Sequence, residues 1–96
     1  MTAACPTFGF VAVLLPRRDL SPDARRALGA AWAAFLEAEG LLESLRSAGS
    51  AEEYEVWREG SQATERDREN TKAWLEQRTD LAGWRLSALG DLKEAT

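Results

Sequence analysis

The chain has 96 residues, of which 45% are hydrophobic and 29% are charged, and its formal net charge is −4. A chain of this length and balance is expected to fold as one domain with one modest core, and disorder of the whole chain is not expected. The acidic net charge also argues against a protein that coats nucleic acid with its whole surface, because phosphate binding requires a positive field.

The first expected element is a strand from Thr7 to Leu15, in which every side chain after Thr7 is apolar except Gly9. Such a run is typical of a strand that is covered on both faces or lies centrally in a sheet. Pro16 lacks a backbone donor and is expected to end it. The run is much shorter than the roughly 20 residues of a membrane span, and no basic residue precedes it as in a signal peptide. We therefore expect a cytoplasmic protein.

A helix is expected to begin at Ser21-Pro22-Asp23 and to end at Gly40. The serine supplies a capping hydroxyl, the proline suits the first helical position, and the acid suits the positive end of the helix dipole. Gly40 suits the left-handed conformation that often closes a helix. Apolar residues at spacings of three and four predict one buried stripe. They are Leu28, Ala31, Trp32, Phe35 and Leu36.

The next segment, residues 41–47, is compatible with another helical turn or with a short strand, and the flanking glycines favour the strand. A turn at residues 48–50 and a second strand from Glu53 to Arg58 would complete a hairpin. In that strand Tyr54 and Val56 face one side of the sheet, and Glu55 and Trp57 face the other.

A second helix is predicted from Glu65 to Arg78. Thr64 with Asp67 three residues later resembles a capping box. Four side chains are expected to face inward, with Trp74 contributing much of the packing. They are Thr71, Ala73, Trp74 and Leu75. Alternating apolar residues from Trp84 to Leu89 then predict a closing strand.

The order strand, helix, strand, strand, helix, strand is that of split βαβ units. We expect an α+β fold, a compact sandwich in which two helices cover one face of a four-stranded sheet. It forms a single domain over residues 1–96, with flexible ends at residues 1–6 and 92–96.

Reactive chemistry is not indicated by the residue types present. The chain has no histidine, which removes the commonest general base and metal ligand. Cys5 is the only cysteine, so no internal disulfide forms, and no glycine pattern matches a phosphate-binding loop. The acids at 52, 53, 55 and 59 are better explained as a solvated strand face than as a metal cluster. We expect no enzyme activity, no metal and no cofactor.

Three sets of residues are candidates for binding. Arg17 and Arg18 precede the first helix and Arg25 and Arg26 begin it, so the four can form a basic corner for RNA or the ribosome, although ordinary solvated faces also explain them. A second basic set on the second helix contains Arg66, Arg68 and Lys72. Trp57 is a candidate protein interface if it is exposed, and core placement at a sheet edge is the alternative.

The spacing of several motifs resembles a known family. Thr64-Glu65 is followed ten residues later by Trp74-Leu75-Glu76-Gln77-Arg78, and then by Ser87-Ala88-Leu89-Gly90-Asp91. With Gly9-Phe10-Val11 and Trp32-Ala33-Ala34-Phe35-Leu36, this pattern is similar to the YggL family, small bacterial proteins described as binding the 50S ribosomal subunit. The resemblance spans about residues 8–92.

This resemblance implies a non-enzymatic factor that associates with the large ribosomal subunit, through rRNA or a ribosomal protein. The alternative interpretation is an acidic protein-interaction module or homodimer that uses the sheet edge and Trp57. Neither interpretation involves a membrane or a small-molecule substrate.

Overall fold

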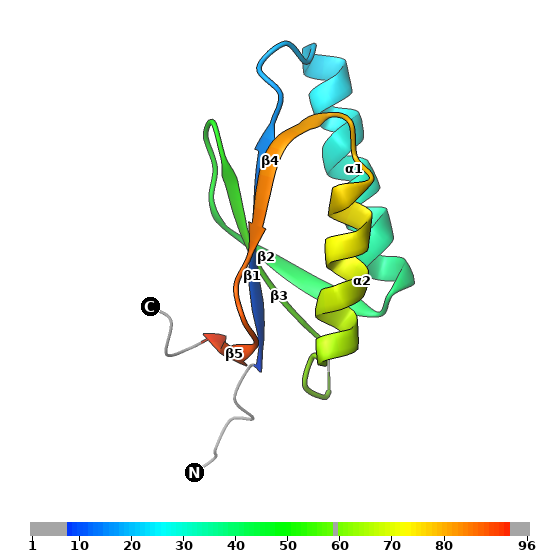
Figure 1. Cartoon of the computed structure of the whole chain (residues 1–96), viewed down its shortest axis with the longest axis vertical. Helices are drawn as coiled ribbons and strands as arrows, with labels where there is room; N and C mark the ends of the chain where they lie inside the picture. The colour runs from blue at the N-terminus through cyan, green and yellow to red at the C-terminus, as the bar shows by residue number, and fades with distance from the viewer. Residues whose placement is uncertain (1–7, 59, 93–96) are drawn as a thin grey trace.

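The protein, seen in a computed structural model, is an open antiparallel sheet with both helices on one face (Figure 1). The structure describes residues 8–58 and 60–92. The elements are β1 (Phe8–Pro16), α1 (Pro22–Ala38), β2 (Leu41–Ser47), β3 (Glu52–Arg58), α2 (Glu65–Glu76), β4 (Leu81–Leu86) and β5 (Gly90–Asp91). The α+β class, the order of elements and the hairpin are therefore confirmed, with five strands among the described residues in place of the four expected.

The sheet has the order β2-β3-β1-β4, so the apolar strand β1 lies at its centre. The fifth strand arises because the predicted closing strand is interrupted at Ser87. There the Ser87 hydroxyl accepts a hydrogen bond from the Val11 backbone N–H (2.8 Å), and the Ser87 N–H donates to the Val11 carbonyl (2.9 Å). A side-chain oxygen thus replaces a strand acceptor. The chain then pairs again as β5, at the Phe8 end of β1.

Both helices begin and end largely where the local signals predict. The Ser21 hydroxyl accepts from the Ala24 N–H (3.1 Å), and Gly40 takes a left-handed φ of 76° after α1. The capping box at Thr64 and Asp67 is complete, with hydrogen bonds of 2.9 and 3.1 Å. Helix α2 ends at Glu76, two residues early, because the next turn directs Arg78 onto Asp80 (2.7 Å) ahead of β4.

The core lies between the sheet and the two helices, and Trp32 is at its centre. Its ring packs against Tyr54 (5.5 Å between centroids) and Trp74 (5.6 Å), and Trp74 stacks on Phe35 (5.2 Å). The Trp32 indole N–H donates to Glu43 (2.9 Å). Phe10, Ala12, Leu14, Leu36, Val56 and Leu75 are also buried there. On α2, Thr71 and Leu75 face inward as predicted, but Ala73 is exposed because it lies off their stripe.

A partly buried ion pair joins the two helices to the sheet at the end where β3 finishes. Arg58 donates two hydrogen bonds to Asp67 (2.6 and 3.2 Å) and one to the Glu39 carbonyl (2.9 Å). Burial alone would raise the pKa of Asp67, but the hydrogen bonds from Arg58 and from the Thr64 backbone outweigh it and lower that pKa. Glycine suits position 40, because its φ of 76° would strain any other side chain and a Cβ would also displace the Arg58 guanidinium, which would lie 2.7 Å away.

Candidate binding surfaces

The structure brings the four predicted arginines to one end of the molecule. Arg17 and Arg18 lie in the loop between β1 and α1, and Arg25 and Arg26 lie near the start of α1, at the top of Figure 1. We call this region the arginine end. This arrangement agrees with the prediction that connectivity places the four arginines in one corner. It does not by itself identify what they bind.

Three of the four arginines are already paired with acids. Arg17 contacts Asp19 (2.6 Å), and Arg26 contacts Asp23. Arg18 is the exception, because it forms no hydrogen bond or ion pair with any described residue. The local positive field is therefore weaker than four arginines in the sequence imply.

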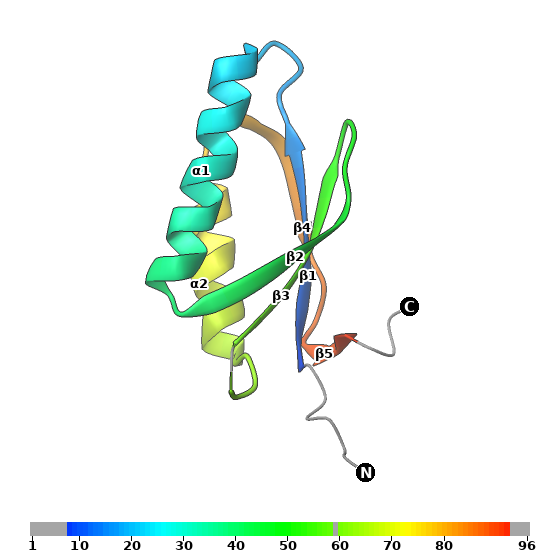
Figure 2. The ribbon, with the colours of Figure 1, turned by 180° about the vertical axis from the view of Figure 1, so that it is seen from behind.

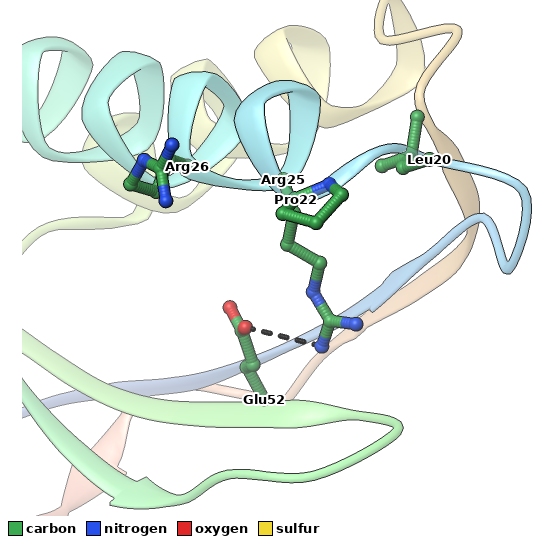
Figure 3. Close-up of a pocket in the computed structure, with 5 residues that line it drawn as sticks. All are labelled: Leu20, Pro22, Arg25, Arg26 and Glu52. Atoms are coloured by element: carbon green, nitrogen blue, oxygen red, sulfur yellow. Dashed lines mark hydrogen bonds and ion pairs between the residues drawn. The ribbon is translucent and has the colours of Figure 1, made fainter.

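Arg25 is the third paired arginine, and it reaches from α1 to the hairpin on the far side of the core. It donates to the Gly49 carbonyl (2.8 Å) and contacts Glu52 (3.4 Å), as Figure 3 shows for the acid. Arg25 lines two depressions. One, of about 520 Å³, is lined by Leu20, Pro22, Arg25, Arg26 and Glu52. The other, of about 280 Å³, is lined by Leu15, Pro16, Arg18, Arg25, Ser50 and Ala82.

A further ion pair adds to the charge balance at this end. Asp80 accepts from Arg78, which lowers the Asp80 pKa, and the nearby charge of Arg17 lowers it further. The Arg17 backbone N–H also donates to the Asp80 carbonyl (3.0 Å). Most of the arginine charge at this end is thus matched by a neighbouring carboxylate, and the arginine end carries little net charge.

The second surface is the sheet face turned away from both helices, which we call the open face (Figure 2). Strand pairing fixes its residues, because directly paired residues in adjacent strands point to the same face. Phe10, Ala12 and Leu14 of β1 are buried beneath the helices, so the alternate positions of β1 and their pairing partners face outward. The open face includes Val11, Val13, Leu15, Leu42, Ser44, Glu53, Glu55, Trp57, Gly83 and Arg85.

An apolar line follows β1 along the middle of the open face. Leu15 is 39% exposed and Leu42 is 38% exposed, while Val11, Val13 and Trp57 are half-buried. The apolar run in the sequence favoured a strand that is covered on both faces or lies centrally in a sheet, and β1 is central. The helices cover one face only, and on the open face the buried Leu92 side chain lies over Gly9.

Charged residues flank this apolar line in a defined row. Val13 pairs with Glu53 of β3 on one side and with Arg85 of β4 on the other. Neither Glu53 nor Arg85 has an ion-pair partner within residues 8–58 and 60–92, whereas the neighbouring Glu55 contacts Arg46 (3.4 Å). Sequence reasoning missed this row, because the alternation of β4 identifies Arg85 as outward but cannot give its register against β1.

Trp57 shares the open face with Glu53 and Glu55, as the strand alternation predicted, and it is half-buried. Leu92, which we expected in a flexible end, is 5% exposed, and its side chain lies over Gly9, 3.2 Å from where a Cβ would be. Residues 1–6 and 93–96 lie outside the described residues, as does Cys5.

Among the described residues, no three of the His, Cys, Asp and Glu side chains are arranged to hold a metal ion. None of the helices described is long and apolar enough to cross a membrane. Comparison with protein-family models, with curated proteins and with solved structures finds no match for this chain.

Proposed function

We propose that the protein is a non-enzymatic binding protein of the cytoplasm, which docks another protein onto the open face of its sheet. The observation that carries the proposal is the apolar line of Val11, Val13 and Leu15, with Leu42 and Trp57 beside it, on a face that the described helices leave uncovered. Exposed apolar surface bordered by charged residues is typical of protein interfaces. An antiparallel sheet facing water normally alternates apolar and polar residues instead.

The proposal predicts that Val13→Asp abolishes partner binding while the domain stays folded. Val13 lies at the centre of the open face, so a carboxylate there would be desolvated by any docked protein. Tagged protein would be used to capture partners from a bacterial extract, with identification by mass spectrometry. The main partner would then be purified and its affinity measured by calorimetry.

Ala34→Asp is the matched control, because it adds the same charge on the exposed side of α1. Binding that survives Ala34→Asp and is lost in Val13→Asp supports the open face as the interface. A partner that binds both variants equally would contradict the proposal, as would the absence of any partner lost in Val13→Asp.

Association with the large ribosomal subunit is a second candidate function. It is favoured by the four arginines at one end, by the lack of a described partner for Arg18 and by the resemblance of the sequence to the YggL family. The acids around these arginines reduce the attraction to phosphate, so binding should be weak and sensitive to salt.

Sedimentation with purified large subunits through a sucrose gradient at low salt tests this second function. We expect Arg18→Glu to reduce co-sedimentation severalfold, because Arg18 has no described partner and its reversal leaves the fold intact. Arg85→Glu, on the open face, is the control because it makes the same charge change at an exposed site outside both basic sets. Protein that stays at the top of the gradient, or Arg18→Glu that sediments like wild type, would refute ribosome binding through this end.

A further inference from the structure

The charges on the open face are self-complementary along the row formed by Glu53, Val13 and Arg85. Adjacent strands are about 4.8 Å apart, so Glu53 and Arg85 are separated by about 10 Å with Val13 midway between them. Neither charge is paired within the described part of the chain. A surface carrying an unpaired anion and an unpaired cation on opposite sides of an apolar centre can match a rotated copy of itself.

From this arrangement we infer that the open face binds a second copy of the same chain, in a face-to-face dimer with its two-fold axis along β1. The inference rests on the proposed function, because it names the protein that occupies the open face. Two aligned sheets pack about 10 Å apart, a distance that arginine and glutamate side chains can bridge.

The direction of the axis follows from the charges. Rotation about an axis along β1 places Val13 over Val13 and exchanges the two sides of the sheet, so Glu53 of each copy meets Arg85 of the other. Rotation about an in-plane axis across the strands would instead place Glu53 on Glu53 and Arg85 on Arg85. Like charges in contact are unfavourable, so the first arrangement is selected.

The shape of the face agrees with the same axis. Trp57 is level with Gly9, and Gly9 pairs on its other side with Gly90 of β5. The chosen rotation places Trp57 of one copy over Gly90 of the other. The space beside Gly90 is open, since a Cβ there would meet no atom within 4 Å. A large ring on one side of the axis therefore meets a glycine on the other, with the Leu92 side chain over Gly9 between them.

The dimer should be weak. One face of this small five-stranded sheet offers less than the roughly 800 Å² per partner of a standard stable interface. We therefore expect a dissociation constant of roughly tens to hundreds of micromolar. Sedimentation velocity of the whole chain, from about 10 μM to 1 mM, covers this range.

Charge reversal tests the pairing directly. Arg85→Glu and Glu53→Arg each create two like-charge contacts per dimer, and each should raise the dissociation constant about tenfold. The double variant Arg85→Glu with Glu53→Arg restores both opposite-charge contacts and should return close to the wild-type value. Lys72→Glu, on exposed α2, is the control that reverses a charge outside the open face and should leave dimerisation unchanged.

Three results would overturn the inference: a monomer throughout the concentration range, a dimer insensitive to both single reversals, or a double variant no tighter than the single ones. If the wild type is a monomer but binds another protein, and Val13→Asp abolishes that binding, the proposed function holds and the open face binds that protein instead of a second copy. A monomer without any such partner would remove both. Far-ultraviolet circular dichroism of each variant confirms that lost dimerisation does not reflect unfolding.

Discussion

Replacing Trp32 with alanine is expected to lower the free energy of unfolding by about 4 kcal/mol, a large part of the roughly 5–15 kcal/mol that stabilises a typical domain. Trp32 is 1% exposed, and its ring joins α1 to Tyr54 of β3 and to Trp74 of α2. Truncation to alanine removes these ring contacts and leaves a cavity between α1, β3 and α2. The three elements cannot all move inward to fill it. Urea denaturation followed by circular dichroism would measure the change.

Trp32→Phe separates the hydrogen bond from the packing, and should lower the free energy of unfolding by about 1–2 kcal/mol near neutral pH. Burial raises the pKa of Glu43, so the folded state favours the neutral form of this carboxyl group. The stability that this group contributes is therefore lost as the pH rises through its pKa in the folded state. The indole hydrogen bond opposes this, because it stabilises the charged carboxylate. The effect of Trp32→Phe should therefore be smaller at pH 4 than at pH 7. An equal effect at both pH values would show that the indole does not stabilise the carboxylate.

Replacing Asp67 with alanine is expected to lower the free energy of unfolding by about 3 kcal/mol. The change removes the reciprocal cap of α2 and leaves Arg58 without its carboxylate. Because the Arg58 side chain is 32% exposed and partly screened, we place the effect at the low end of values for buried pairs. Thermal and urea unfolding would both report the loss. Asp23→Ala, which removes an exposed ion pair of α1, is the control and should change stability little.

Acidification should lower the free energy of unfolding of the wild type, because protonation of Asp67 removes its ion pair with Arg58. The pKa of Asp67 is lowered in the folded state, so its contribution is present above its unfolded value of about 3.8 and is lost as pH falls through the folded value. Asp80 acts with the same sign, because the hydrogen bond from Arg78 lowers its pKa. The stability of Asp67→Ala should fall less steeply than that of the wild type below about pH 4. Parallel pH profiles of the two proteins would contradict a stabilising ion pair between Arg58 and Asp67.

The local signals in the sequence determined the elements and their ends. These signals act through the backbone of a few neighbouring residues, so they can be identified without the rest of the fold. They are the N-caps at Ser21 and Thr64, Gly40 at the C-terminal end of α1 and the apolar run of β1. The order of these elements then sufficed to predict helices on one face of an antiparallel sheet. The early end of α2 and the break at Ser87 escaped prediction, because each depends on hydrogen bonds to distant residues or to the following turn.

Only the tertiary structure decided what the charged residues do. The sequence places Arg25 in a basic corner, but the fold brings Glu52 and the Gly49 carbonyl to it from a distant part of the chain. Likewise, Glu53, Val13 and Arg85 form a row only because strand register aligns three separate segments. Pairing register follows from the packing of the whole sheet, and a shift of one residue would turn these side chains to the other face. The sequence by itself therefore determined the architecture, whereas the open face and its charges were decided by long-range pairing.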